Sequence, residues 1–506
     1  MTKVLELHGI TKRFGALTAN DGITLSLAQG EILALLGENG AGKTTLMNIL
    51  FGHYAADDGW VRVFGQDMPP GRPRAAIEAG IGMVHQHFTL AANLTVLENV
   101  MLGSEPLGRL RSARQSARAK LLEIAEKFGL AVNPDAKISH LSVGERQRVE
   151  ILKALYRDAR VLILDEPTAV LARPEAQRLF ETLREMTREG LSLIFISHKL
   201  HEVMSASDRV AVLRAGKLVA ERETAQTSPK ELAELMVGRQ VERPVREPHE
   251  IGAPTLVARG ITVGEGEETQ LNEVSFTVHG GEILGIVGVS GNGQAALGAL
   301  LSGLVHPSSG TLSLAGENAA ALGPRSMIRA GAGRVPEDRH AEGVVGELAL
   351  WENAVLERLR TSEFSRHGLV RQKVCKAYTA DLIERFDIRG ATPDTRTQLL
   401  SGGNMQKLIL GRVLSSDPRF ILANQPTRGL DEGAIAAVHA ELLAARMAGA
   451  AILLISEELE EAVALSDRIQ AIVKGRMSDP ITADAATPQR LGLIMSGVWE
   501  AHADAS

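Results

Sequence analysis

The sequence predicts an α/β protein of two tandem domains, each built on a mainly parallel sheet with a helical subdomain. Three observations predict this fold class. The 506 residues exceed the ~250 to 300 at which a single hydrophobic core stops growing. Short apolar runs such as EILALLG, RVLILDE and LSLIFISH alternate with helical stretches such as PEAQRLFETLREMTREG, as expected for parallel strands joined by helices. Finally, one unit occurs twice along the chain.

The repeat is visible at the level of motifs. Residues 29–42 read QGEILALLGENGAG and residues 280–293 read GGEILGIVGVSGNG, an offset of 251 residues (293 − 42). Further along, LSVGERQ from Leu141 matches LSGGNMQ from Leu400 at an offset of 259 (400 − 141). The second half therefore carries an insertion of eight residues (259 − 251), which we expect between about 338 and 399.

The domain boundary is predicted at a segment without periodicity. The stretch RQVERPVREPHEIGAP is rich in proline and charge, as a short exposed linker is. We therefore expect a first domain at residues 1–240, a linker at 241–254 and a second domain at 255–500.

Composition excludes several other classes of protein. The chain is 44% hydrophobic and 23% charged, as ordinary folded domains are. With a net charge of −6, the chain lacks the broad positive field that non-specific nucleic-acid binding needs. The single cysteine, Cys375, excludes an intrachain disulfide. The first residues lack the apolar region of a secretory signal, and no apolar run approaches the ~18 residues of a membrane span, so any membrane role is expected to be peripheral.

The strongest local motif is GENGAGKTT in the first half. It satisfies the G-x-x-x-x-G-K-[ST] phosphate loop and lies between an apolar strand and a helical stretch, which is the context that the motif requires. Lys43 is expected to bridge the β- and γ-phosphates of ATP, and Thr44 to ligate Mg²⁺. The predicted nucleotide-binding residues here are Gly37, Glu38, Asn39, Gly40, Ala41, Gly42, Lys43, Thr44 and Thr45.

Two carboxylates end the apolar run RVLILDEP. Asp165 is expected to hold Mg²⁺ through water, and Glu166 to orient and polarise the attacking water. Acidic pairs at strand ends are often only surface caps. Beside a phosphate loop the catalytic interpretation is favoured, because phosphoryl transfer depends on a few well-aimed polar groups.

LSVGERQ and LSGGNMQ resemble the signature motif of ATP-binding-cassette proteins, which are tandem P-loop NTPase domains in two-lobed members. The resemblance covers both halves and implies further site residues: Gln86 as a Gln-loop residue and metal ligand, His198 as a switch histidine and Phe14 as an adenine-stacking aromatic. Taken alone, each has a structural alternative, a surface polar residue, a strand-end histidine and a core aromatic respectively. Their order relative to the phosphate loop favours the functional interpretation.

The second half departs from the pattern at nearly every catalytic position. The counterparts of Lys43, Thr44, Gln86, Phe14, Asp165, Glu166 and His198 are, in that order, Gln294, Ala295, Glu337, Glu265, Asn424, Gln425 and Glu457. A glutamine supplies no cation, an alanine binds no Mg²⁺ and a neutral amide accepts no proton. Hydrolysis in the second half is therefore expected to fail, although weak nucleotide binding is compatible with these changes.

Lobes of this superfamily pair head to tail, so the resemblance implies that each phosphate loop faces the signature of the other lobe. The intact first-half groups would then meet Ser401, Gly402, Gly403 and Gln406 of LSGGNMQ, together with Asp431 of TRGLD. The degenerate site would face LSVGERQ, where Val143 replaces the first glycine, and Ala172 stands at the counterpart of Asp431. Val143 as a merely tolerated apolar variant is the alternative.

The motifs GVSGNGQ, VPEDRHAEGVV and NQPTRGLD resemble those of ATPase subunits of bacterial importers for simple sugars and nucleosides. MVHQHFTL and GNGQ favour the nucleoside class, which works with a lipoprotein-type binding protein. The resemblance implies ATP and Mg²⁺ as cofactors, two integral-membrane permease subunits and an extracytoplasmic solute-binding protein as partners, and a peripheral location on the cytoplasmic face of the inner membrane. A ribosome or translation factor with tandem cassettes is the main alternative, and the short linker, negative charge and single intact site disfavour it. A DNA-repair ATPase is a weaker alternative, because a single cysteine and the lack of a heptad run offer neither a zinc-binding nor a coiled-coil insertion.

Overall fold

The computed structural model describes residues 2–15, 17–85, 88–104, 114–168, 171, 173–197, 199–238, 244–264, 266 and 269–498. It divides into two compact units, here lobe 1 (Met1–Val241) and lobe 2 (Glu242–Ser506).

Lobe 1 has a mainly parallel sheet, with helices on one side and an antiparallel sheet on the other. Its strands and helices are β1 (Lys3–Phe14), β2 (Leu17–Ala28), β3 (Ile32–Leu36), α1 (Lys43–Phe51), β4 (Asp58–Val63), β5 (Gln66–Asp67), α2 (Pro73–Glu78), β6 (Ile81–Val84), α3 (Val96–Met101), α4 (Arg114–Lys127), α5 (Val143–Tyr156), β7 (Val161–Asp165), α6 (Arg173–Arg188), β8 (Ser192–Ile196), α7 (Leu200–Ala206), β9 (Arg209–Arg214), β10 (Lys217–Glu223) and α8 (Pro229–Val237). The main sheet has the order β10-β9-β3-β8-β7-β6, and β2-β1-β4-β5 form the antiparallel sheet.

Lobe 2 repeats this plan. Its strands and helices are β11 (Pro254–Val263), β12 (Leu271–His279), β13 (Ile283–Val287), α9 (Gln294–Leu301), β14 (Ser309–Leu314), β15 (Glu317–Asn318), α10 (Pro324–Arg329), β16 (Ala332–Val335), the π-helix η4 (Arg339–Gly343), α11 (Leu350–Val355), β17 (Ser365–Arg366), β18 (Leu369–Val370), α12 (Gln372–Arg385), α13 (Gly402–Leu414), β19 (Phe420–Asn424), α14 (Glu432–Met447), β20 (Ala451–Ile455), α15 (Leu459–Leu465), β21 (Arg468–Val473), β22 (Arg476–Met477), β23 (Ile481–Thr482) and α16 (Pro488–Met495). The main sheet runs β16-β19-β20-β13-β21-β22.

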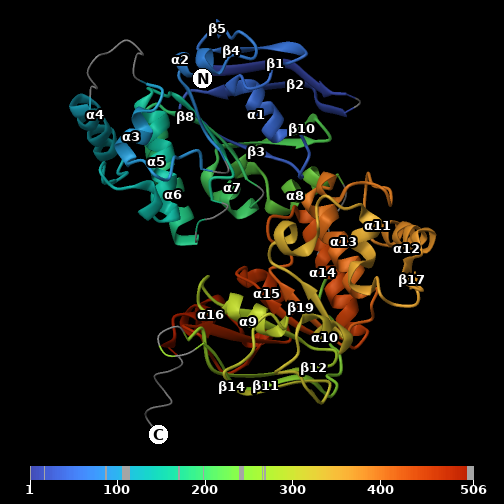
Figure 1. Cartoon of the computed structure of the whole chain (residues 1–506). Helices are drawn as coiled ribbons and strands as arrows, with labels where there is room; N and C mark the ends of the chain where they lie inside the picture. Colours follow the sequence, from blue (N-terminus) through green and yellow to red (C-terminus); the bar gives the residue numbers. More distant parts are fainter. Residues whose placement is uncertain are drawn as a thin grey trace. The chain divides into compact units, whose positions relative to one another are not determined.

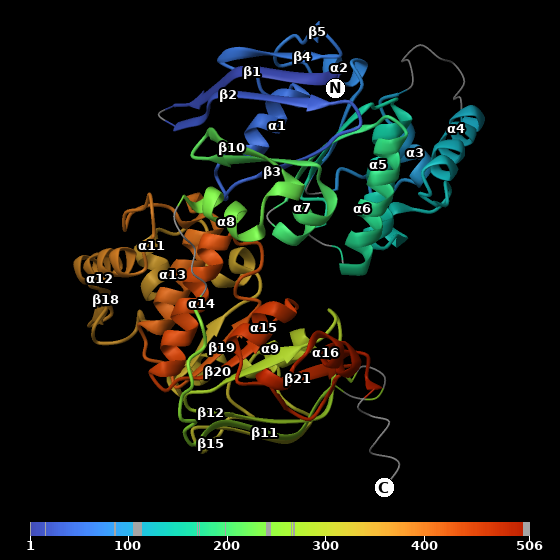
Figure 2. The ribbon, with the colours of Figure 1, turned by 180° about the vertical axis from the view of Figure 1, so that it is seen from behind.

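The core strands are buried on both faces. In β3, Ile32, Ala34 and Leu36 pack into one hydrophobic cluster, together with residues of α3 to α6. The alternate residues Leu33 and Leu35 pack into a second cluster, with residues of β1, β2 and α1. Continuous apolar runs in the sequence are therefore parallel strands covered on both sides. Figures 1 and 2 show α3, α4, α5 and α6 on one side of lobe 1 and the sheet of β1, β2, β4 and β5 on the other.

The fold class predicted from the sequence is confirmed, and each lobe has a helical subdomain. The insertion in lobe 2 is divided rather than single. Helices α3 and α11 begin at Val96 and Leu350, an offset of 254 (350 − 96), so three extra residues precede α11, where η4 lies. Helices α4 and α12 end at an offset of 258 (385 − 127), so four more lie around the hairpin β17–β18. The eighth lies before α13, which begins at an offset of 259 from α5 (402 − 143).

The described part of the predicted linker is tied to lobe 2. Arg246 donates hydrogen bonds to Asp467 at 3.2 Å and to Asp484 at 2.8 Å. The carbonyl of Glu247 accepts from the buried guanidinium of Arg446 at 3.0 Å. Residues 244–253 thus follow the surface of lobe 2 without forming a helix or strand.

Candidate functional site

The phosphate loop of lobe 1 lies between β3 and α1, and its backbone requires glycine. Gly37, Gly40 and Gly42 have φ of 152°, 85° and 97°, in the region that other residues rarely adopt. A Cβ would lie 2.3 Å from the carbonyl oxygen of Leu213 if added to Gly37, and 2.2 Å from that of Ala19 if added to Gly42. The loop therefore folds as a tight turn into the N-terminus of a helix, which favours anions.

Lys43 places its ammonium group on this loop. The side chain is buried, and Nζ donates hydrogen bonds to the carbonyls of Gly37 at 2.7 Å and Glu38 at 3.0 Å. Glu38, Asn39, Gly40 and Ala41 complete the loop, and Thr44 and Thr45 begin the first turn of α1. A cation is thus held where the phosphates of a nucleotide would meet the helix N-terminus.

Asp165 ends β7 and lies next to the phosphate loop. Burial, followed by the charge of Glu166, raises the pKa of Asp165 to about 6, while Lys43 and a hydrogen bond with Thr44 act in the opposite direction. Two hard oxygen donors, the Thr44 hydroxyl and the Asp165 carboxylate, therefore lie together. Such a set fits Mg²⁺, which takes few protein ligands and completes its shell with phosphate and water.

Glu166 has a left-handed backbone, with φ of 47°. For a residue other than glycine this conformation costs about 1–3 kcal/mol and is typical of functional positions. Its N–H donates to the carbonyl of Ile196 at the end of β8 at 3.1 Å. Gln425, its counterpart, has the same φ of 47° and donates to Ile455 at 2.8 Å. Lobe 2 has therefore kept the strained backbone although the carboxylate is lost.

Glu202 on α7 is a site neighbour that sequence reasoning missed. Its buried carboxylate accepts hydrogen bonds from Thr168 Oγ1 at 2.7 Å and from Ser197 Oγ at 2.9 Å. It joins the segment after Glu166 to the end of β8, directly before position 198. The available signal was a glutamate on an otherwise apolar helix face.

Four residues named from the sequence, Gln86, Ala172, His198 and Glu265, lie outside the described residues. Phe14, at the end of β1, is 45% exposed and is not a core aromatic. Its ring lies 5.5 Å from that of Tyr54 in an edge arrangement. Tyr54, which sequence reasoning also missed, gives lobe 1 an exposed aromatic pair.

In lobe 2 the side chain of Gln294 forms hydrogen bonds across the loop that corresponds to the phosphate loop of lobe 1. The Oε1 atom of Gln294 accepts from the backbone N–H of Asn292 at 3.0 Å, and its Nε2 donates to the carbonyl of Val289 at 3.0 Å. Val289 is the counterpart of Glu38, so the amide repeats one hydrogen bond of Lys43. It also uses a loop N–H and supplies no charge.

The other counterparts in lobe 2 remove charge and metal ligands. Ala295 has no side-chain oxygen, and Asn424 is buried and neutral, with no hydrogen-bond partner for its Oδ1 among the described residues. Glu337 forms an ion pair with Arg428, and Glu457 is exposed. The arrangement that could hold MgATP in lobe 1 is therefore absent from these positions.

The two signature loops differ in charge. In lobe 1, Ser142 caps α5, and the Glu145 carboxylate accepts from both its N–H and its hydroxyl at 2.8 Å. A Cβ on Gly144 would lie 3.2 Å from the carboxylate of Glu175. Two carboxylates therefore border this helix N-terminus.

In lobe 2, Ser401 caps α13 and accepts from the N–H of Asn404. The amide of Asn404 is bound to the backbone of Arg389 at 3.1 Å. Gly403 faces the methyl group of Ala434, the counterpart of Glu175. Both carboxylates of the lobe 1 signature are thus replaced by neutral groups.

Two further predicted residues accompany this signature. The side chain of Gln406 is buried within α13. Asp431 caps α14, accepting from the N–H of Ala434 at 2.9 Å. The structure brings both to the same end of lobe 2 as Ser401.

Comparison with known proteins decides the family. The sequence model described as ABC transporter matches residues 20–169 and 271–428. The chain belongs to the ABC transporter family. It is an ABC-type ATPase with two cassette lobes, which confirms the family resemblance and the nucleotide binding predicted from the sequence.

Relatives match this ABC ATPase over nearly its whole length. The guanosine import ATP-binding protein NupO of Bacillus subtilis is 44% identical over 99% of both chains. The glucose import ATP-binding protein TsgD13 of Haloferax volcanii is 42% identical over 99% of this chain and 97% of its own. An archaeal ribosome recycling factor, solved with a ribosomal stalk protein, covers 97% of this chain and 92% of its own with a TM-score of 0.63 and 20% identity. That last similarity shows the fold alone.

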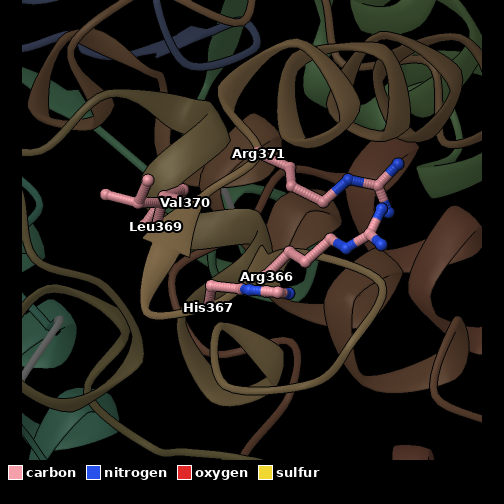
Figure 3. A pocket seen from close by; sticks show the side chains of 5 residues that line it. All are labelled: Arg366, His367, Leu369, Val370 and Arg371. Carbon is pink, nitrogen blue, oxygen red and sulfur yellow. The ribbon is translucent and has the colours of Figure 1, made fainter.

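A shallow hollow lies apart from the predicted site residues of the ABC ATPase, at the hairpin β17–β18. It is lined by Arg366, His367, Leu369, Val370 and Arg371. Figure 3 shows Arg366 and Arg371 extending to the same side, away from Leu369 and Val370.

Within the described part of the chain, no helix combines the length and apolar character needed to cross a membrane.

Proposed function

We propose that this chain is the energy-coupling subunit of an importer for a nucleoside or simple sugar, with one competent ATP site per chain. The competent site joins the phosphate loop and carboxylates of lobe 1 to the signature of lobe 2, from the same chain or a second copy. The observation that carries the proposal is the sorting of charge. Cationic and metal-binding groups occur in the lobe 1 loop, and the lobe 2 signature lacks the two carboxylates that border the lobe 1 signature.

The proposed roles follow from the positions of the groups. Lys43 neutralises the β- and γ-phosphates. Thr44, Asp165 and Gln86 would hold Mg²⁺, which would supply further positive charge at the phosphate oxygens. Glu166 orients the attacking water, and His198 contacts the γ-phosphate.

Other groups contact the adenine and complete the surroundings of the γ-phosphate. Phe14 stacks on adenine. The Ser401 hydroxyl and the Gly403 N–H receive the γ-phosphate at a helix N-terminus, and Asp431 reaches the opposite phosphate loop.

The opposite pairing is disfavoured electrostatically. A γ-phosphate at the lobe 1 signature would approach the carboxylates of Glu145 and Glu175, and like charges at short range repel. The phosphate loop that faces this signature would be that of lobe 2, where Gln294 supplies no cation. Both defects fall on one site, which supports a division into one working and one degenerate site.

The solute is a separate matter, since the ATPase lobes of such systems do not touch it. Relatives named for guanosine and for glucose import are 44% and 42% identical, so overall similarity does not choose between nucleoside and sugar. We favour a nucleoside on the motifs MVHQHFTL and GNGQ. The proposed partners are two permease subunits and an extracytoplasmic binding protein, with docking at residues 87–99 and 338–353 on the cytoplasmic face of the membrane.

A matched pair of substitutions tests the composite site. Ser401→Arg places bulk and positive charge in the proposed working site and is expected to abolish ATP hydrolysis. Ser142→Arg, the same change at the counterpart, is expected to leave substantial hydrolysis. Both proteins are first checked for folding by circular dichroism and thermal melting. Equal losses, or a greater loss from Ser142→Arg, would refute the crosswise assignment.

A further inference from the structure

Lobe 2 contains a π-helix that has no equivalent in the described part of lobe 1. Helix η4 lies between β16 and α11, where lobe 2 has its three extra residues. Asp338 caps it, accepting from the N–H groups of His340 and Ala341 at 2.9 Å each. Because π-helical turns are rare and are frequent at functional sites, the contacts of this insertion are informative.

The first residue of this helix, Arg339, reaches two segments far along the chain. Its Nη1 donates to the carbonyl of Arg428 at 2.6 Å and its Nη2 to that of Gly429 at 3.4 Å. These carbonyls lie shortly before Asp431. The guanidinium therefore fastens the segment that leads into α14.

The same guanidinium lies against the signature loop. A Cβ on Gly402 would lie 2.9 Å from Nη2 of Arg339 and 3.2 Å from its Cζ and Nε atoms. Gly402 is the first residue of α13 and has no left-handed backbone, so backbone strain does not explain the glycine. A side chain at this position would instead require the guanidinium of Arg339 to move.

Lobe 1 differs at both partners of this contact. Val143 stands at the counterpart of Gly402 and has a side chain where the guanidinium of Arg339 lies in lobe 2. The segment after β6 is three residues shorter than its equivalent after β16. Arg339 and Gly402 thus form one unit that belongs to the signature lacking the two carboxylates.

The charges around Arg339 and Gly402 indicate that this pair of residues favours a bound anion. Burial lowers the pKa of Arg339, which reports a cost for its charged form. A cation is also unfavourable beside the N-terminus of a helix, where the backbone dipoles are positive. A bound anion at this helix end would offset both costs, and the γ-phosphate of ATP is such an anion.

We propose that Arg339 is a positioning residue for the lobe 2 half of the ATP site. It holds the signature loop and the segment at 428–429 in one arrangement, and it connects both to residues 338–353. The inference rests on the proposed function, because the signature of lobe 2 must meet the γ-phosphate. Arg339 acts on the nucleotide indirectly, through the contact of its guanidinium with Gly402.

A double-mutant cycle in the full-length chain tests this inference. Arg339→Ala removes the guanidinium, and Gly402→Ala places a methyl group where the guanidinium contacts the signature loop. Each is expected to raise the KM for ATP about tenfold, the effect of losing one or two charge-assisted hydrogen bonds. Because both changes break the same contact, the KM for ATP of the double variant is expected to be no higher than that of the more impaired single variant. Arg339→Lys, which keeps the charge without the planar donor pair, is expected to recover only part of the affinity.

Two readouts separate positioning from general structural damage. The affinity for ADP, measured by calorimetry, is expected to be unchanged, because ADP lacks the γ-phosphate. Arg366→Ala, which removes an exposed arginine of the hairpin β17–β18 outside the proposed site and docking segments, is the matched control and is expected to keep the wild-type KM. Additive losses, an unchanged KM in Arg339→Ala, or an equal loss of ADP affinity would overturn the inference. If Ser401→Arg also left hydrolysis intact, the composite site itself would be wrong, which is a different result.

Discussion

The contrast between Lys43 and Gln294 gives the sharpest test of the asymmetry between lobes. Both side chains close a phosphate loop: Lys43 with hydrogen bonds of 2.7 Å and 3.0 Å, Gln294 with two of 3.0 Å. Only Lys43 carries charge. Removing one preorganised group that stabilises developing charge costs about 10²–10³ in kcat, or roughly 3–4 kcal/mol.

Lys43→Ala is therefore expected to reduce the ATPase rate by at least that factor. Gln294→Ala removes two neutral hydrogen bonds, worth about 1 kcal/mol each, and is expected to lower the stability of lobe 2 by about 2 kcal/mol without changing hydrolysis. Steady-state phosphate release and chemical denaturation measure the two effects. Glu166→Gln and Gln425→Ala form a second pair with the same expected contrast. Comparable loss of activity within either pair would show that the lobe 2 site is catalytic.

Two further predictions concern stability and location. The pKa of Asp467 is lowered although burial opposes this, because Arg446 and the N–H of Ile283 donate hydrogen bonds to its carboxylate. The stability it contributes is present above its unfolded pKa and is lost as pH falls through the folded value. Asp467→Asn is thus expected to cost about 3–5 kcal/mol at pH 7, as for a broken buried pair, and less in acid. In Asp208→Asn the amide oxygen can keep the hydrogen bond from the N–H of Ile32, 2.8 Å in the wild type, and only the surface ion pair with Arg184 at 3.5 Å is lost. The expected cost is under about 1 kcal/mol, and equal melting temperatures for the two variants would contradict this. Separately, the protein is expected to sediment with membranes only in cells that contain its permease; binding without the permease, or co-purification with ribosomes, would overturn the importer assignment.

Local patterns in the sequence were sufficient for the family, the repeat and most of the candidate site. The phosphate loop, the carboxylates after β7 and the signatures are contiguous motifs, and a glycine loop between a strand and a helix has few other uses. The losses at Gln294, Ala295, Asn424 and Gln425 are visible by subtraction of an offset. These inferences depend on residue type and spacing, which the chain carries directly.

Only the tertiary structure decided how the remaining groups are used. That Gln294 closes its own loop, that Gln425 keeps the strained φ of 47° and that Phe14 is exposed beside Tyr54 cannot be read from spacing. Gly402 appeared in the sequence as an ordinary signature glycine, whereas the structure places it against Arg339, which also binds a carbonyl 89 residues further along the chain. Such contacts join segments that are remote in sequence, and their partners are selected by how the strands and helices pack, because a hydrogen bond depends on distance and direction in space.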